Sequence, residues 1–335
     1  MKTVSTQFIE NKTVLLRLDL DVPLRLVRQA HSKQAQSKLV VEDDFRLKAA
    51  IPTLKLCLED ASKVIIMGYL GRPNGVEVPG LSVAPIYQWL QAQRYGRDLG
   101  NGKLKLLENL RFEPGEDACD LNYAKELASF GEIFINEAFA AYHLAASTTV
   151  LPTLLPHFAG LRFSEEVKKL MELRNNPKRP LVAIIGGAKV EDKKDFIFEM
   201  SKRADTVLVG GKLAADLVGP AHNVLVGKLN QDGTDITENT LDLWEGIIKG
   251  AGQIIWNGPV GKVEDDGSRK GTERLTKIIL ESNAEVIVGG GDTVGFLGST
   301  GMLEKFEDHG FVSTGGGAML EFLTKGTLPS IEALE

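Results

Sequence analysis

In the second half of the chain, short runs of β-branched and other apolar residues are each followed by glycines and then by a helix-like segment. The runs are LVAIIGGAKVEDK from residue 181, DTVLVGGKLAADL from 205, QIIWNGPVGKVED from 253, EVIVGGGDTVGFL from 285 and FVSTGGGAMLEF from 311. Continuous apolar strands that alternate with helices predict a mainly parallel, doubly wound sheet covered by helices on both faces. Because the carboxyl ends of parallel strands meet at one edge, all five turns are expected there.

The first half has similar apolar strands, but charged residues rather than glycine runs follow them. The strands lie in KTVLLRLDLDVP from residue 12, SKVIIMGYLGRP from 62, KLKLLENLRF from 103 and EIFINEAF from 132. This alternation predicts a second α/β domain of the same three-layer kind. The two halves then differ at their strand ends, which carry arginines and carboxylates in the first and bare peptide N–H groups in the second.

The stretch SEEVKKLMELRNNPKRP between the halves predicts an amphipathic connecting helix. It is expected to begin with Ser164 as its N-cap, and Pro177 follows its end. The domain limits expected from these patterns are residues 1–160 for the first domain, 161–178 for the connecting helix, 179–320 for the second domain, and 321–335 for a C-terminal segment that returns to the first domain.

Composition narrows the class of protein. The 335 residues are 43% hydrophobic and carry a net charge of −6, which argues against general nucleic-acid or anionic-membrane binding. Cys57 and Cys119 lie far apart without a C-x-x-C motif, so neither a disulfide framework nor a zinc site is expected, and a reducing cytoplasm fits best. No stretch approaches the ~18 apolar residues of a membrane span, and the N-terminus lacks a signal-peptide core.

Glycine at a strand-to-helix turn lets a ligand approach the backbone, and the helix start presents unpaired N–H groups to an anion. Neither the Walker A pattern nor G-x-G-x-x-G occurs, so a phosphate site of another kind is expected. Lys189 and Lys193 are spaced to share one helix face beside phosphates, or are simply solvated. Asp292 suits a Mg²⁺ bridge to phosphates or a helix N-cap, and Glu264 suits ribose hydroxyls or water.

Taken together and in order, these motifs resemble the phosphoglycerate kinase family. The match runs through RLDLDVP, YLGRP, LLENLRF, NEAFAAYH, GGAKVEDK, VGGKLAADL, WNGPVGKVE, GGGDT, STGGGA and LPSIEAL, which span nearly the whole chain. The resemblance implies a phosphotransferase that moves a phosphoryl group reversibly between 1,3-bisphosphoglycerate and ADP, giving 3-phosphoglycerate and ATP. It also implies a first domain that binds 3-phosphoglycerate, a second that binds ATP or ADP with Mg²⁺, and a hinge that closes.

The resemblance assigns site residues by position. In the first domain the implied substrate contacts are Asp19, Asp21, Arg46, Tyr69, Leu70, Gly71, Arg72, Arg111 and His143. In the second the implied nucleotide contacts are Gly186, Gly187, Lys189, Lys193, Gly210, Gly211, Asn257, Pro259, Glu264, Gly290, Gly291, Asp292 and Thr293, with Asp292 linked to the metal. The groups implied to surround the transferred phosphoryl group are Arg46, Lys189, Gly291, Gly315, Gly316 and Gly317.

Several positions depart from the family pattern. Asp21 stands where the family has Asn, Tyr69 where it has His, Leu144 where it has Arg, and Ala146 where it has a second His. Losing one charge-assisted phosphate contact weakens binding by about 1.5–3 kcal/mol unless another cation replaces it. The candidates for that replacement lie in an insertion at residues 25–38: Arg25, Arg28 and Lys33.

Other departures concern the periphery of the fold. Residues 31–38, HSKQAQSK, are expected to form a polar surface loop. Residues 96–106 and 219–235 are shorter than the family pattern, which predicts missing helices and a missing strand. Two rival functions stay open from the sequence: an ATP-dependent kinase of another small phosphorylated or carboxylic acid, and a nucleotide-binding protein without catalysis. A monomer is expected.

Overall fold

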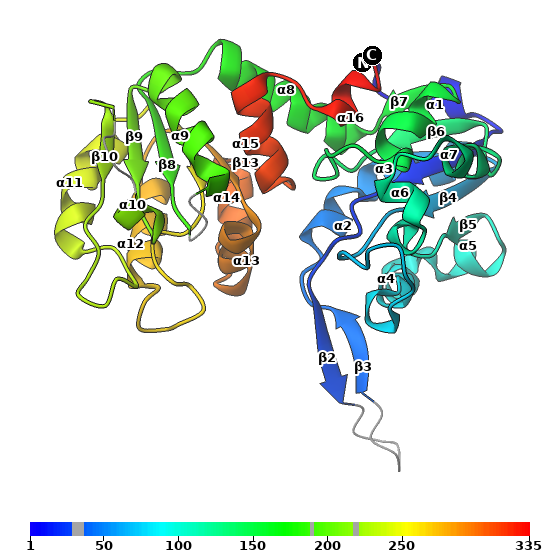
Figure 1. The fold of residues 1–335 in the computed structure, drawn as a ribbon, viewed down its shortest axis with the longest axis horizontal. Coiled ribbons are helices and arrows are strands. Elements are labelled where there is room, and N and C mark those ends of the chain that lie inside the picture. The colour runs from blue at the N-terminus through cyan, green and yellow to red at the C-terminus, as the bar shows by residue number, and fades with distance from the viewer. Residues whose placement is uncertain (29–36, 188–190, 217–220) are drawn as a thin grey trace. The chain divides into compact units, whose positions relative to one another are not determined.

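The chain divides into two compact units (Figure 1). The structure is a computed structural model that describes residues 1–28, 37–187, 191–216 and 221–335. Unit 1 comprises Met1–Val167 and Thr327–Glu335, and unit 2 comprises Lys168–Gly326. The sheet of each unit is built entirely from parallel strands, which confirms the predicted α/β fold class.

Unit 1 is built on a five-stranded sheet of order β5-β4-β1-β6-β7. Its strands are β1 (Thr13–Arg17), β4 (Lys63–Met67), β5 (Leu104–Leu106), β6 (Ile133–Asn136) and β7 (His157–Ala159). Its helices are α1 (Thr6–Ile9), α2 (Phe45–Ala49), α3 (Ile51–Asp60), α4 (Ala84–Leu90), α5 (Gly96–Gly100), α6 (Pro114–Asp117), α7 (Leu121–Ala128) and α16 (Pro329–Glu332).

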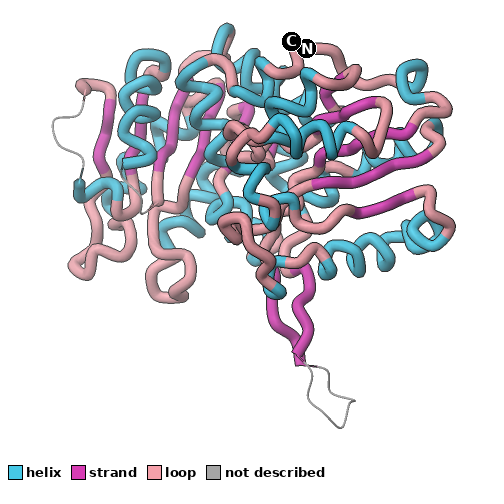
Figure 2. The backbone as a smooth tube through the Cα atoms, turned by 45° about the vertical axis from the view of Figure 1, so that its right-hand side comes forward, coloured by secondary structure: helices cyan, strands magenta, loops and turns pink. Residues whose placement is uncertain are grey.

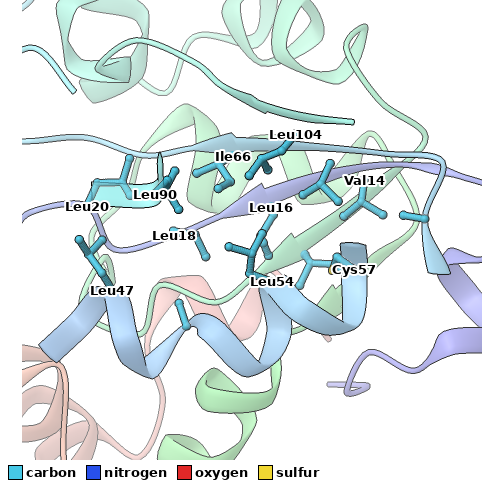
Figure 3. Packing of buried hydrophobic residues seen from close by; sticks show 14 of the residues in the cluster. Val14, Leu16, Leu18, Leu20, Leu47, Leu54, Cys57, Ile66, Leu90 and Leu104 are labelled. Carbon is cyan, nitrogen blue, oxygen red and sulfur yellow. The ribbon is translucent and has the colours of Figure 1, made fainter. Parts of the chain in front are cut away.

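The core of unit 1 lies between its sheet and α3 (Figure 3). Alternate residues of β1, Val14 and Leu16, face Leu54 and Cys57 of the helix, and all four are fully or almost fully buried. Each such leucine stabilises the fold by about 1.5–3 kcal/mol relative to exposure. Burial also raises the pKa of the Cys57 thiol to about 12, so this cysteine is a packing residue.

A two-stranded antiparallel ribbon accompanies this sheet. It consists of β2 (Leu24–Arg28) and β3 (Ser37–Val41), with Leu24 opposite Val41 and Arg28 opposite Ser37. Leu24 and Val41 pack against the core, and from there the ribbon extends away from the body of the unit (Figures 1 and 2). Of the loop predicted over residues 31–38, residues 31–36 lie outside the described residues. The prediction is wrong for the last two, because Ser37 and Lys38 belong to β3 and pair with Arg28 and Val27 of β2.

The helix that joins the units, α8 (Leu161–Asn175), begins at the first residue of the expected connecting segment and three residues before Ser164. Ser164 is consequently inside the helix and is not its N-cap. The first N–H groups are instead satisfied by distant side chains: Leu161 donates to Thr53 Oγ1 at 2.9 Å, and Arg162 and Phe163 donate to the Glu137 carboxylate at 3.0 and 3.1 Å. A cap supplied from elsewhere in the chain leaves no local signal at the helix start.

Glu137 makes this cap sensitive to pH, because burial raises the pKa of its carboxyl from 4.5 to about 7. Between those values the unfolded carboxyl loses its proton and the folded one keeps it, so stability falls as pH rises. We expect the free energy of unfolding to fall by up to about 3 kcal/mol relative to Glu137→Gln across this window, measured by urea denaturation. Glu126→Gln, at an exposed site on α7, is the control. Parallel pH profiles for wild type and Glu137→Gln would rule out this linkage.

Unit 2 is built on a six-stranded sheet of order β10-β9-β8-β11-β12-β13. Its strands are β8 (Leu181–Ile185), β9 (Thr206–Val209), β10 (Val224–Val226), β11 (Gln253–Asn257), β12 (Glu285–Gly289) and β13 (Gly310–Val312). Its helices are α9 (Glu191–Arg203), α10 (Leu213–Asp216), α11 (Glu238–Lys249), α12 (Lys270–Leu280), α13 (Gly291–Ser299), α14 (Leu303–His309) and α15 (Gly316–Lys325).

The central strands of this sheet, β8 and β11, are buried at every residue. Two contacting helix pairs, α9 with α15 and α11 with α12, accompany the sheet. Burial on both faces explains why apolar residues are consecutive in these strands, LVAII in β8 and IIW in β11, rather than alternating with polar ones. The parallel pairing of the strands places the five glycine turns together at the carboxyl edge of one sheet, as the pattern predicts.

Across the described parts of both units, we find no helix with the length and apolar character required to span a membrane.

Candidate functional site

In unit 1 two aspartates follow β1, and one arginine joins them. Arg46, on α2, lies 3.2 Å from Asp19 Oδ2 through its Nη1 and donates to the Asp21 carbonyl at 2.8 Å. The side chain of Asp21 binds the loop after β4, since its Oδ1 accepts a hydrogen bond from the Gly71 N–H at 2.9 Å. The structure thus brings four of the predicted substrate residues into one bonded group.

Burial and the ion pair together shift the pKa values of Asp19 and Arg46. Burial raises the pKa of Asp19, and the nearby Arg46 guanidinium opposes that rise. The same pairing raises the pKa of Arg46, so the guanidinium stays charged. The side chain of Arg46 keeps 27% of its surface exposed, and that surface is available to a ligand.

The loop after β4 brings Tyr69 against two arginines. The Arg111 guanidinium carbon lies 3.6 Å from the centre of the Tyr69 ring, and that of Arg17 lies 4.9 Å from it. Arg111 also donates to the Gly71 carbonyl at 3.0 Å and pairs with Asp117 at 3.0 Å. Arg111 and Tyr69 are therefore fixed in one place, as the predicted assignment requires.

Arg17, which the sequence-based assignment missed, is the last residue of β1 and is completely buried. Its Nε donates to Ser147 Oγ at 3.0 Å and its Nη1 to the Leu18 carbonyl at 2.5 Å, while its Nη2 has no hydrogen-bond partner among the described residues. Ser147 in turn donates to the buried carboxylate of Glu116. A charged residue inside an otherwise apolar strand, VLLRL, was the available signal.

The remaining substrate-side residues are placed differently. Leu70 is buried, and its N–H and carbonyl both bond the Asn109 side chain, which fixes the substrate loop. Arg72 is exposed, and no hydrogen bond or ion pair of its side chain occurs within the described parts of the chain. His143 is exposed with its ring 4.0 Å from that of Tyr142, and Leu144 next to it is 64% exposed.

In unit 2 the first glycine turns pack against one another. A Cβ on Gly186 would lie 2.2 Å from the Pro259 carbonyl oxygen, and one on Gly211 would lie 2.8 Å from the Gly187 nitrogen. Gly187 and Gly211 have φ values of +103° and +65°. Protein backbone therefore accounts for the missing side chains here, and Gly210 is likewise closed by Val260 at 2.6 Å.

The turns of the later strands are more open. Gly290, with φ +106°, is the N-cap of α13, and Gly291 begins that helix with no atom within 4 Å of a Cβ built on it. Gly315 is the N-cap of α15, and a Cβ on Gly316 would lie 2.3 Å from the Gly290 Cα. Gly317 is exposed. Two helix N-termini therefore begin side by side at the carboxyl edge of this sheet.

Polar side chains surround these turns. Lys193 donates to the Gly186 carbonyl at 2.5 Å, whereas Lys189 lies outside the described residues. Asn257 is 3% exposed, and its Nδ2 has no hydrogen-bond partner in the described structure. Thr293 accepts from the Gly258 N–H at 2.8 Å, which ties α13 to the turn after β11.

Asp292 lies in the first turn of α13 and is exposed. Its interpretation as an N-cap is wrong, because Gly290 occupies that position. Glu264 is also exposed. The described residues contain no group of three or more His, Cys, Asp or Glu side chains able to hold a metal ion by themselves.

A cavity of about 200 Å³ lies elsewhere in unit 2. Its lining includes Leu181 at the start of β8, Arg174 and Arg203. This is the amino-terminal edge of the sheet, opposite the glycine turns. Arg174 there donates to the Leu323 and Thr324 carbonyls at the end of α15, so it serves as a helix C-terminal cap.

A comparison with known protein families identifies the family to which this fold and these motifs belong. The family model for phosphoglycerate kinase matches residues 4–232 and 220–326. The chain belongs to the phosphoglycerate kinase family.

Curated relatives support this membership over almost the full length. Phosphoglycerate kinase of Moorella thermoacetica is 32% identical, with 97% of this chain and 97% of that protein covered. That of Leptospira biflexa is 31% identical, with 98% and 96% covered. The first alignment runs over 395 residues, more than the 335 of this chain, so the relative contains segments that this member of the family lacks.

Solved structures agree. The phosphoglycerate kinase structure from Coxiella burnetii matches with a TM-score of 0.77 at 28% identity, covering 97% of this chain and 96% of that one. The structure from Pyrococcus horikoshii matches with a TM-score of 0.78, covering 100% and 98%, and at 24% identity it supports the fold.

Proposed function

We propose that this phosphoglycerate kinase family member transfers a phosphoryl group reversibly between 1,3-bisphosphoglycerate and ADP, giving 3-phosphoglycerate and ATP. The observation that carries the proposal is the pairing of two kinds of anion receptor in one chain. Unit 1 offers two fixed guanidinium groups, Arg46 on α2 and Arg111 after β5, and unit 2 offers the adjoining N-termini of α13 and α15. Phosphoryl transfer needs such positioning and charge neutralisation rather than a protein nucleophile.

On the substrate side, Arg111 and Arg72 bind the phosphate of 3-phosphoglycerate, and Asp19 and Asp21 accept from its hydroxyl group. His143 and the loop of Tyr69, Leu70 and Gly71 complete this site. Arg46, held by the two aspartates, points its exposed guanidinium surface at the transferring phosphoryl group. Because Arg46 is already held in position, it does not need to move when negative charge develops on the transferring phosphoryl group.

On the nucleotide side, N–H groups at the starts of α13 and α15 bind phosphate oxygens. The contacts that we assign are Gly186, Gly187, Lys189, Lys193, Gly210, Gly211, Asn257, Pro259, Glu264, Gly290, Gly291, Asp292 and Thr293, with Gly315, Gly316 and Gly317 facing the transferred group. The buried, unpartnered Nδ2 of Asn257 supports the assignment, because such a donor is costly unless a ligand or water accepts from it.

Mg²⁺ fits this donor set through one residue. Asp292 is exposed beside the two helix starts, and Mg²⁺ is commonly held by one or two carboxylates together with nucleotide phosphates. When bound, the ion neutralises charge on the transferring phosphoryl group.

The domain roles follow from these sites. We assign 3-phosphoglycerate binding to residues 1–160 and nucleotide binding to residues 179–320, joined by residues 161–178. We assign residues 321–335 to the segment that returns to the first domain. The grouping of Thr327–Glu335 with unit 1 supports this assignment for the last nine residues, whereas residues 321–326 group with unit 2. We further propose that hinge closure brings the ligands together and excludes water, and that the enzyme is a cytoplasmic monomer.

The deciding experiment is ATP formation from ADP and 1,3-bisphosphoglycerate, with and without Mg²⁺, followed by a panel of other small phosphorylated and carboxylic acids in the reverse direction. We expect Mg²⁺-dependent ATP formation and a preference for 3-phosphoglycerate. Preference for another acid would favour the alternative kinase. Binding of Mg-ADP without turnover of any acid would favour a non-catalytic nucleotide-binding protein.

A further inference from the structure

We propose that Tyr69 is a positioning residue, whose ring holds the guanidinium groups of Arg17 and Arg111 together as one receptor for the substrate phosphate. This inference rests on the proposed function and names how its phosphate site is built. The paired arginines provide positive charge in the same unit in which Leu144 and Ala146 provide none.

The geometry of the ring contacts carries the first step. Arg111 lies 3.6 Å and Arg17 lies 4.9 Å from the ring centre, both within the ~6 Å over which an aromatic face attracts a cation. Two guanidinium groups this close to one ring repel each other. An electron-rich ring in contact with both groups offsets part of that repulsion, which an aliphatic side chain at position 69 cannot do.

The partners of each arginine fix where its remaining N–H groups point. Arg111 donates a hydrogen bond from Nε to Asp117 and another from Nη1 to the Gly71 carbonyl. Arg17 spends Nε on Ser147 and Nη1 on Leu18, while its buried Nη2 has no hydrogen-bond partner in the described part of the chain. A buried guanidinium N–H left without an acceptor is costly, and a phosphate oxygen or a water satisfies it.

The network behind Arg17 connects this receptor to the altered segment. Ser147 immediately follows Ala146, and both its hydroxyl and its N–H donate to the Glu116 carboxylate, at 2.5 and 3.0 Å. The chain between His143 and Ser147 therefore contributes to the receptor by anchoring Arg17 instead of contributing a cation. Leu144 itself is 64% exposed.

The charge of the phenol is consistent with this role. Burial raises the pKa of Tyr69, so the hydroxyl is protonated at neutral pH and adds no negative charge beside a phosphate. The ring is the part that contacts both arginines, so removing only the hydroxyl should matter little.

The test compares Tyr69→Leu with Tyr69→Phe, using 3-phosphoglycerate as the probe in calorimetry and in steady-state kinetics. Tyr69→Leu is expected to raise KM and Kd for 3-phosphoglycerate about tenfold, with less than threefold change in kcat and in KM for ATP. Tyr69→Phe, which keeps the ring, is expected to lose less than threefold. Tyr87→Leu, at a 39% exposed tyrosine on α4 of the same unit, is the matched control.

A second variant separates positioning from folding. In the Tyr69→Leu background, Leu144→Arg is expected to recover most of the lost affinity, because it returns a cation to the phosphate site. Unchanged 3-phosphoglycerate affinity in Tyr69→Leu, or equal losses in Tyr69→Leu and Tyr69→Phe, would overturn the proposal. Equal increases in KM for both substrates would also overturn it, since they indicate a general structural defect.

Failure of the proposed function can be distinguished from failure of the Tyr69 proposal, because the activity is measured on the wild-type protein and the role of Tyr69 on the variants. If the wild-type protein does not phosphorylate 3-phosphoglycerate, titration with inorganic phosphate still tests the receptor. The same order of affinities, wild type and Tyr69→Phe above Tyr69→Leu, is then expected, and no difference among the three would reject it.

Discussion

Replacing Arg46 by alanine is expected to lower kcat by on the order of 10³-fold or more, with KM for the nucleotide changed less than about twofold. Arginines that neutralise a transferring phosphoryl group have effects of this size. Arg46 is held by Asp19 and by the Asp21 carbonyl, so it acts from a fixed position. Steady-state kinetics in the direction of ATP formation, with both substrates varied, measure this split.

The control for Arg46→Ala is Arg97→Ala, at an exposed arginine on α5. Because Asp19 would be left buried without its partner, thermal unfolding of Arg46→Ala should be measured beside the kinetics. Arg46→Lys tests geometry, since lysine keeps the charge but lacks the planar guanidinium group. Equal losses in kcat and in nucleotide affinity would contradict the role assigned to Arg46.

The second large effect is expected from one pair of matched substitutions at helix starts in unit 2. Gly316→Ala should lower the free energy of unfolding by about 1–3 kcal/mol, because its Cβ would lie 2.3 Å from the Gly290 Cα. Gly291→Ala meets no protein atom within 4 Å, so its free energy of unfolding should change by less than about 0.5 kcal/mol. Its methyl group would nevertheless occupy space needed by a phosphate, and Kd for Mg-ADP should rise at least about tenfold.

Each member of the pair is the first residue of its helix, so the comparison holds helix position constant. Urea denaturation gives the stabilities, and calorimetry with Mg-ADP gives the affinities. Normal Mg-ADP binding by Gly291→Ala would show that the open turn does not face the nucleotide. Unchanged stability of Gly316→Ala would show that the two helix starts move apart easily.

Much of the fold could be predicted because its signal is local. Consecutive apolar residues, as in LVAII and QIIWN, are typical of strands covered on both faces, and both strands are buried along their full length. The cap of α8 could not be predicted, because its first N–H groups bond Thr53 and Glu137, which are far away in the sequence. The pairing of Ser37 and Lys38 also had no apolar alternation to reveal it.

The site divides in the same way. The motifs single out Asp19, Arg46 and Arg111, and the structure joins Arg46 to Asp19 and Arg111 to the Gly71 carbonyl. Arg17 escaped prediction because its neighbours in VLLRL predict only a buried strand. Its role is visible from Tyr69 and Ser147, which reach it from other strands' loops.

The sequence alone determined the order of strands and turns, the family, and the chemical difference between a charged half and a glycine-rich half. These depend on short-range periodicity and on motifs whose members are neighbours in the chain. Only the tertiary structure showed that a side chain on Gly186 or Gly211 would collide with neighbouring backbone, whereas a side chain on Gly291 would meet no protein atom within 4 Å. Only it, too, showed that Tyr69 lies against two arginines. Such facts depend on distances between segments far apart in sequence, which no local pattern encodes.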